Sequence, residues 1–537
     1  MDAKRIDREI DASPMATALL ARVSRVAAAV GMLLLAGCAV GPDFHKPAAP
    51  NVAGYTDHPL TTTDSSANIA GGEAQHFVEQ GDIPGDWWTL FHSKPLSGLI
   101  EQSLASNHDL KAAQAALLVA RENVLAQRGS YYPSVAADFS ASRQKTPSTI
   151  SPTPSTNALL YNVFTPQVSV SYVPDIFGLT RRTTESLKAQ EQAVRFQMIA
   201  THITLSSNVV VAAVQEGSLR AQIEATRELV DINTHMVKIL RYQLAKGYAS
   251  RLDLAAQESQ LAQVNATLPP LLKQLAQQRD LLAVLVGRFP SQPPDETFEL
   301  ASLQLPQELP LSLPSELVAQ RPDVRQAEAN LHAASAQIGI ATANRLPNIT
   351  LTANAGSTAL AIGQVFKSGT GFWAVGADVA APIFQGGTLL HQQRAAKAAY
   401  VQAAEQYRST VLSAFQNVAD TLVALEQDAA GLKTAVAATD AAKITLDLSQ
   451  RQLHDGYASY LYVLSAEQTY QQARISLVQA QAARFADTAA LFQALGGGWW
   501  QRSELSGAGP VRSDPTRTDS TQADPLQTGS RPSANEK

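Results

Sequence analysis

The 537-residue chain has a single cysteine and few aromatic residues. One thiol cannot close an intrachain disulfide, so the stability of the fold must come from packing or from assembly. Aromatic side chains make up only 6% of the sequence, whereas Ala, Gln, Leu and Val are abundant, a composition that suits long helices. The net charge is −5 and no block of basic residues occurs, which argues against nucleic acid as a partner.

The sequence also lacks the motifs of enzyme chemistry. It has no phosphate-binding loop, no clustered zinc-ligand spacing and no nucleophile elbow. His108, His332 and His391 are isolated on predicted helices and are interpreted as structural or solvated residues. We therefore predict that the protein is not an enzyme and holds no cofactor or metal.

Long apolar runs are missing after Cys38. No stretch of about 18 apolar residues follows it, so no transmembrane helix is expected in the mature chain. If the mature protein crosses a bilayer, it must do so as a closed β-barrel, because that is the only other way to satisfy the backbone in lipid.

The single cysteine closes a recognisable targeting signal. Cys38 ends the run Leu-Ala-Gly-Cys, which follows the apolar stretch 26–34, and Arg22 and Arg25 precede that stretch. This arrangement predicts a signal peptide over residues 1–37 that ends in a lipobox, with Cys38 as the thioether site for a lipid. The alternative is a chance cysteine beside an ordinary signal peptide.

The residue after Cys38 and the position of the start codon refine this interpretation. Position 39 is Ala, and in bacterial lipoproteins an Asp there usually retains the protein at the inner membrane, so the resemblance points to the outer membrane. Met15 would give a signal peptide of more usual length than Met1, and either could be the true start.

The chain repeats its landmarks in one order, with offsets between 207 and 214 residues. The pairs are Asp109 and Asp323, Pro133 and Pro347, Phe177 and Phe384, Gly247 and Gly456, Glu258 and Glu467, and Gly287 and Gly496. We interpret the chain as a tandem duplication, with a first repeat over 92–288, a Pro-rich linker over 289–314 and a second repeat over 315–498. Residues 38–91 are expected to be extended, and residues 499–537 to form a disordered tail.

Each repeat is predicted to run helix, strand, strand, long helix, turn, helix. The helices are expected over 94–129, 179–245, 251–286, 315–345, 388–454 and 461–495, and the strands over 132–142, 167–173, 348–355 and 373–379. The strands alternate apolar residues with small or polar ones, as in a membrane barrel around a wet lumen. A half-buried soluble sheet has the same alternation.

Four strands cannot close a barrel around a channel, and an open edge cannot face lipid. A membrane barrel would therefore have to be shared between several chains. The Ser, Thr, Pro and Gly-rich segments 144–164 and 357–371 are expected to be hairpin loops that face the outside of the cell.

The predicted helix 179–245 would be about 100 Å long, more than a globular core needs. Apolar residues form a heptad seam along it, and a second seam lies beside the first, so the helix should have neighbours on both sides. The first seam is Leu219, Ile223, Thr226, Val230, Asn233, Val237, Leu240 and Leu244; the second is Leu229, Ile232, Met236 and Ile239. An ordinary antiparallel bundle of long helices is the alternative.

Both long helices end in the same turn sequence. Gly247, Tyr248, Ala249 and Ser250 end the first, and Gly456, Tyr457, Ala458 and Ser459 end the second. Glycine after a helix end favours the left-handed cap, and either serine can N-cap the helix that follows. These turns should lie at the tip of the molecule opposite the strands.

Several motifs, taken in order, closely resemble the TolC-type outer membrane efflux proteins, in the OprM/NodT lipoprotein branch. They are Gly41-Pro-Asp-Phe44 with Pro47, Trp88-Thr-Leu-Phe91 before Leu96, and Arg321-Pro-Asp-Val-Arg-Gln-Ala-Glu328. The resemblance covers residues 38 to about 500. It implies a mainly α chain with a β-barrel segment, in which three copies build a 12-stranded transmembrane barrel continued by a long periplasmic α-helical barrel.

The resemblance also implies partners and a mode of action. It implies a homotrimeric outer membrane duct whose tip turns meet a periplasmic adaptor (a membrane fusion protein), which links the duct to an inner-membrane pump of the RND class. Acidic residues that ring the family's closed aperture correspond here to Tyr462 and Ser465, while Asp253 is acidic in the first repeat. We expect an aromatic constriction at Tyr462 in place of a carboxylate gate.

The leading hypothesis is a passive efflux duct for small molecules. A duct for type I protein secretion and a lipid-anchored coiled-coil scaffold are the alternatives. The sequence does not identify the exported substrate, the cognate pump or the adaptor.

Overall fold

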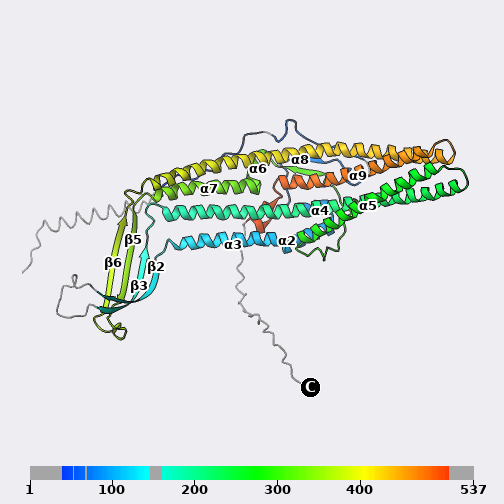
Figure 1. Ribbon diagram of the computed structural model, residues 1–537. Coiled ribbons are helices and arrows are strands. Elements are labelled where there is room, and N and C mark those ends of the chain that lie inside the picture. Colours follow the sequence, from blue (N-terminus) through cyan, green and yellow to red (C-terminus); the bar gives the residue numbers. More distant parts are fainter. Residues whose placement is uncertain (1–38, 53, 67–68, 146–159, 507–537) are drawn as a thin grey trace, which may run out of the picture.

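The computed structural model describes residues 39–52, 54–66, 69–145 and 160–506. The chain is mainly helical and elongated, with a four-stranded sheet at one end and two long helical hairpins that reach the other end (Figure 1). The predicted signal peptide 1–37 and the predicted lipidation site Cys38 lie outside the described residues.

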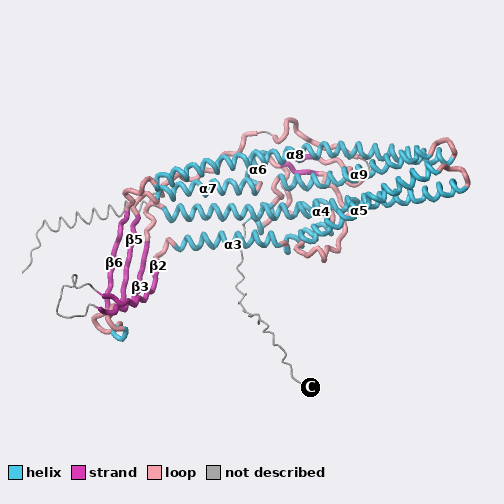
Figure 2. The backbone as a smooth tube through the Cα atoms, viewed as in Figure 1, coloured by secondary structure: helices cyan, strands magenta, loops and turns pink. Residues whose placement is uncertain are grey.

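The two halves of the chain have the same order of long elements (Figure 2). The helices are α2 (Lys94–Ser106), α3 (His108–Gly129), α4 (Leu179–Ala245) and α5 (Arg251–Leu285), then α6 (Pro314–Gln320), α7 (Pro322–Ala343), α8 (Thr388–His454) and α9 (Tyr460–Ala494). Short 3₁₀ turns are η1 (Trp87–Phe91), η2 (Leu300–Ser302), η3 (Ile362–Gln364) and η4 (Trp499–Gln501).

Helices α4 and α8 confirm the predicted ranges 179–245 and 388–454, and each has 67 residues. Helix α4 packs against α3, α5, α7 and α9, which confirms that it has neighbours on several sides. Most of its first seam is buried, whereas in the second seam Leu229 is buried and Ile239 is 37% exposed. One 18-residue window of α4 is apolar enough to cross a membrane, but 67% of that window is buried, as in a core helix.

The predicted helices 94–129 and 315–345 are each broken in two. Asn107 separates α2 from α3, because its side-chain Oδ1 accepts hydrogen bonds from the backbone N–H groups of Asp109 and Leu110 at 2.9 and 3.0 Å and so caps a new helix. Arg321 separates α6 from α7, and Pro322 occupies the first turn of α7, where a missing N–H costs nothing.

The four-stranded sheet is antiparallel, in the order β2, β3, β5, β6. Its strands are β2 (Ser134–Lys145), β3 (Leu160–Tyr172), β5 (Asn348–Ser357) and β6 (Gly371–Ala380). Strands β2 and β3 are longer than predicted and enter the expected loop 144–164 from both sides, because their ladder continues through polar pairs such as Arg143 and Asn162. Residues 146–159 of that loop lie outside the described part of the chain.

The extended N-terminal segment and the Pro-rich linker meet in the middle of the molecule. Strand β1 (His76–Glu79) pairs in parallel with β4 (Glu308–Leu311), a contact that the sequence pattern did not predict. The largest hydrophobic core lies beside this pair, where Trp87, from η1, stacks on Phe492 of α9 at 5.2 Å between ring centroids. Apolar burial here holds both segments against the helices.

Regular structure extends into the predicted disordered tail 499–537. Residues 499–501 form η4 and Ser503–Ser506 form the short helix α10, so the prediction of disorder was wrong for residues 499–506. The indole N–H groups of Trp499 and Trp500 donate to the backbone O of Gln320 and to Asp82 Oδ1 at 2.6 and 2.9 Å. These contacts anchor η4, and residues 507–537 lie outside the described residues.

Candidate functional site

The four-stranded sheet has one apolar face and one small or polar face. Residues paired directly across neighbouring strands share a face. One row on the apolar face joins Val135, Val170, Ala353 and Val375, and the next row joins Ala137, Val168, Ala355 and Trp373. A row on the opposite face joins Ser134, Ser171, Thr352 and Gly376. The alternation predicted from the sequence therefore continues in register across all four strands.

The apolar face is uncovered in the single chain. Val375 and Trp373 on strand β6 are 75% and 78% exposed, and Val135 on β2 is 69% exposed. Strands β2 and β6 are the outer strands, and within the described residues each pairs with a neighbour on one side only. An exposed apolar face with two open edges is a surface that needs a partner.

At the far end, both tip turns have the predicted left-handed glycine. Gly247 has a φ of +82° and Gly456 a φ of +78°. In both turns the glycine N–H and the N–H of the next tyrosine return to carbonyl groups of the last helical turn, the Schellman arrangement. Tyr248 and Tyr457 are 84% and 87% exposed, so each turn presents an aromatic ring to its surroundings.

The serine caps of the two turns differ. Ser250 forms a capping box with Asp253: its Oγ accepts from the Asp253 N–H at 3.1 Å, and the carboxylate accepts from the Ser250 N–H at 3.1 Å. Ser459 occupies the N-cap position of α9 but makes no side-chain cap bond, so that prediction was wrong for the second turn. The residue three positions on is Tyr462, which offers no carboxylate to complete a box.

The three predicted aperture residues lie close to the tip on two different helices. Tyr462 is 70% exposed and shares an exposed stripe of α9 with Ser465. Asp253 is half-buried at the start of α5, where its carboxylate serves the capping box.

A buried carboxyl group near the tip was not singled out by sequence reasoning. Glu467 of α9 is 1% exposed, and within the described residues neither of its carboxylate oxygens has a hydrogen-bond partner. Burial raises the pKa of Glu467 from 4.5 to about 7. Its repeat counterpart Glu258 instead pairs with Arg241 at 2.7 Å on the surface. The offset of the repeats marked the two glutamates as equivalent, but no local signal showed that one is buried.

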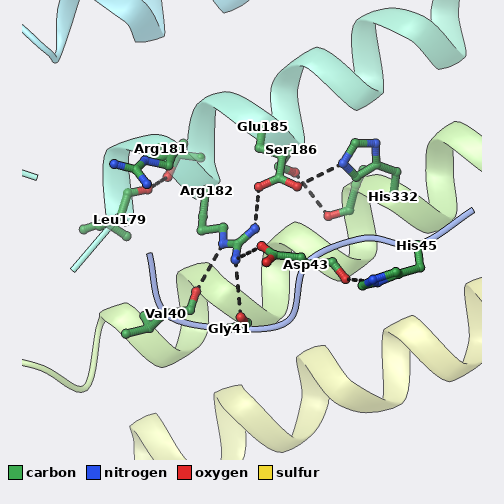
Figure 3. A network of polar contacts seen from close by, with 12 residues as sticks. Val40, Gly41, Asp43, His45, Leu179, Arg181, Arg182, Glu185, Ser186 and His332 are labelled. Carbon is green, nitrogen blue, oxygen red and sulfur yellow. Dashed lines mark hydrogen bonds and ion pairs between the residues drawn. The ribbon is translucent and has the colours of Figure 1, made fainter. Parts of the chain in front are cut away.

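A second polar cluster involves the segment that follows the predicted lipidation site in the sequence (Figure 3). The buried side chain of Arg182, in the first turn of α4, donates to Asp43 Oδ1 and to Glu185 Oε2, both at 2.8 Å. The other oxygen of Glu185 lies 2.9 Å from His332 Nε2, and the His332 ring stacks on Phe44. The hydrogen bond and the charge of Arg182 lower the pKa of Asp43. His332 was predicted to be isolated, whereas it contacts both Glu185 and Phe44, and the role of Arg182 was missed.

Comparison with known proteins assigns this architecture to a family. The family profile "Outer membrane efflux protein" matches residues 99–288 and 313–497. The toluene efflux pump outer membrane protein TtgC of Pseudomonas putida is 31% identical over 484 residues, which cover 89% of this chain and 96% of TtgC.

Solved structures show the same fold. The outer-membrane channel OprN matches with a TM-score of 0.76 and 25% identity, over 86% of this chain and 100% of that one. The open state of the MtrE outer membrane channel of Neisseria gonorrhoeae matches with a TM-score of 0.73 and 26% identity, over 86% and 98% of the two chains. With its two-faced sheet, its long hairpins and these matches, the chain belongs to the family of outer membrane efflux proteins.

Proposed function

We propose that three copies of this outer membrane efflux channel form one passive duct. Each copy contributes four strands to a closed 12-stranded barrel in the outer membrane and two long helical hairpins to an α-helical barrel in the periplasm. The observation that supports this most directly is the exposed apolar face of a sheet that, in the described chain, has two open edges.

Closure follows from the chemistry of the bilayer. Lipid cannot satisfy backbone N–H and C=O groups, so the free sides of β2 and β6 must pair with strands of neighbouring copies. Four strands are too few to enclose a channel. The apolar face would then contact lipid, and the face that carries Ser134, Ser171 and Thr352 would line a wet lumen.

Two neighbouring residues of β6 test this orientation. Val375 lies on the apolar face and Ala374 on the opposite face, and both are exposed. Val375→Lys should place three cations in lipid, at a cost of about 2–4 kcal/mol each near the bilayer midplane, and abolish trimers that resist SDS before heating. Ala374→Lys, the matched control, should leave trimers intact and change single-channel conductance in planar bilayers. A stable monomer of the unmodified protein, or a larger loss with Ala374→Lys, would refute the proposal.

Transport through this duct would be passive, because the sequence has no nucleotide-binding motif. Energy would come from an inner-membrane pump of the RND class, joined to the duct by a periplasmic adaptor at the exposed turns that carry Tyr248 and Tyr457. Deletion of the gene followed by susceptibility tests with small toxic compounds would show efflux. Unchanged susceptibility with loss of a secreted protein would instead support type I secretion.

The tip would also contain the constriction of the duct. We assign it to Tyr462, which is exposed on α9, with Ser465 one turn further along and Asp253 in the first turn of α5. Tyr462→Ala should increase the leak of small ions through reconstituted trimers, whereas Tyr457→Ala, in the turn itself, should not. Equal conductance of the Tyr462→Ala variant and the unmodified trimer would rule out this assignment.

The anchor of the duct would be a lipid on Cys38. The lipobox supports this proposal, and mass spectrometry of the N-terminal peptide of the purified protein tests it. The unmodified thiol, or an N-terminus other than Cys38, would contradict it.

A further inference from the structure

One arginine donates three hydrogen bonds to the segment that directly follows the proposed lipid attachment point. We call residues 39–47 the N-terminal arm. Arg182 donates from Nε to the backbone O of Val40 at 3.1 Å, and from Nη2 to the backbone O of Gly41 at 3.3 Å and to Asp43 Oδ1 at 2.8 Å. Nη1 donates to Glu185, which fixes the guanidinium on its own helix (Figure 3). The planar fork of arginine suits such a set of acceptors, and a lysine could not bind them all.

Glycine lets the arm lie directly on the helix backbones. Gly41 has a φ of +97°, and a Cβ there would come within 2.5 Å of the Gly339 Cα on α7. A Cβ on Gly339 would in turn lie 2.8 Å from Cγ of Arg182, and a Cβ on Gly178 would lie 2.7 Å from the Ala39 Cα. A side chain at any of these three positions would clash at such distances. The close packing of the arm against α7 and the start of α4 therefore requires glycine there.

The arm runs from the sheet toward the middle of the molecule. Ala39 lies at Gly178, just before α4, and the Val40 N–H donates to the Phe177 backbone O at 3.1 Å. Phe44 then stacks on His332 at 4.3 Å, seven residues and about 10 Å down α7 from Gly339. Ala39, the first residue of the arm, is therefore the arm residue nearest the strands.

We propose that Arg182 is a positioning residue for the lipid anchor. By clamping the arm, it makes the acyl group on Cys38 leave the protein at the junction between the sheet and the helices, where the membrane boundary would lie. This inference rests on the proposed lipidation and on the proposed membrane position of the sheet. Without Arg182, residues 39–47 would lose three hydrogen bonds and become more mobile, and the lipid would fix the height and tilt of the chain less tightly.

Mobility of the arm provides the first test. Cys38 is the only cysteine and is blocked when acylated, so a nitroxide on His45→Cys, an exposed position of the arm, would be the sole label. We expect an immobile spectrum in the otherwise unmodified trimer and with Arg181→Gln, the exposed neighbour on α4. Arg182→Gln should give a mobile spectrum and Arg182→Lys an intermediate one. Amide exchange over residues 40–44 should accelerate about tenfold or more, as expected for loss of a hydrogen bond to a charged group.

Asp43→Asn is a second variant that should not disturb folding, because the Asp43 side chain is 82% exposed. It weakens the contact between Arg182 and the arm without changing Arg182 itself. It should mobilise the label while the trimer keeps its resistance to SDS. A label that stays immobile in both Arg182→Gln and Asp43→Asn, or one already mobile without either substitution, would overturn the clamp.

A second test separates positioning of the lipid from structural support. In the acylated chain, Arg182→Gln should reduce the fraction of trimers assembled in the outer membrane several-fold. The same substitution should have no further effect in a Cys38→Ala chain exported behind a signal peptide that adds no lipid, because the two changes then act on one step. An equal loss in both backgrounds would overturn the positioning role. If the label is immobile but Cys38 carries no acyl group, the proposed lipidation would be wrong, while the contacts of Arg182 with the arm would still be supported.

Discussion

Glu467→Gln should stabilise the tip of the molecule, and increasingly so as the pH rises. The Glu467 carboxyl is buried on the face of α9 that also carries Val463, which packs against Leu446 of α8. Glutamine has almost the same shape but carries no charge at any pH. The substitution therefore removes the penalty for burying a charge and leaves the packing in place.

The size and sign of the effect follow from the pKa. Burial raises the pKa of Glu467 from 4.5 to about 7, and each pKa unit corresponds to about 1.4 kcal/mol. The folded state binds the proton more tightly, so the stabilisation from protonated Glu467 is complete below pH 4.5 and is lost as the pH rises through 7. Relative to the wild type, Glu467→Gln should gain about 3 kcal/mol at pH 8 but less than about 1 kcal/mol at pH 5.

Native-state amide exchange over 460–470, corrected for the intrinsic effect of pH, measures this free energy of opening. Asp487, whose pKa burial also raises to about 7, is present in both proteins, so its contribution cancels in the difference. Glu258→Gln is the matched control, because its partner Arg241 holds it on the surface, where ion pairs contribute about 0–1 kcal/mol. A gain for Glu467→Gln that is equal at pH 5 and pH 8, or a loss at pH 8, would refute the reasoning.

Three further predictions concern the helices. Ser250→Ala should destabilise the start of α5 by about 1 kcal/mol, while Ser459→Ala should be nearly neutral because Ser459 makes no side-chain cap bond; amide exchange on both sides of the tip turns would show the contrast. Gly431→Ala, in the middle of α8 with open space around it, should raise the free energy of unfolding by about 0.5–1 kcal/mol in a thermal melt. Burial lowers the pKa of His202 to about 4, so the contribution of His202 to stability should fall as the pH drops from 6.5 to 4. The stability of His202→Gln relative to the wild type should therefore rise over that range in the same melt, because the contributions of all other groups cancel in the difference.

Long regular elements could be predicted from the sequence because their signals are local and repeated. The glycine turns at Gly247 and Gly456 located the C-terminal ends of α4 and α8, and the heptad seams predicted that α4 has neighbours on both sides. The alternation of apolar residues located the four strands, but it stopped where polar residues such as Arg143 continued the ladder. Backbone pairing extends a strand without any apolar signal, so the strand ends could not be predicted.

Contacts between distant segments could not be predicted in the same way. Strands β1 and β4 have four residues each and lie more than 200 positions apart, so neither produces a periodic pattern. Arg182 looked like any charged residue in a long helix, since three of its four acceptors come from the N-terminal arm. Glu467 and Glu258 occupy equivalent positions of the two repeats, and only the surrounding helices decide which one is buried.

The two halves of the molecule have matching dimensions but not matching charge. Helices α4 and α8 have 67 residues each, and α5 and α9 have 35 each, so the two turns of one chain lie level with each other. The glycine of one turn follows Lys246, and that of the other follows Asp455. Three copies would present a rim of six similarly shaped hairpins on which positive and negative positions alternate. A partner that recognises shape alone could occupy six equivalent places on this rim, whereas one that recognises charge would find only three.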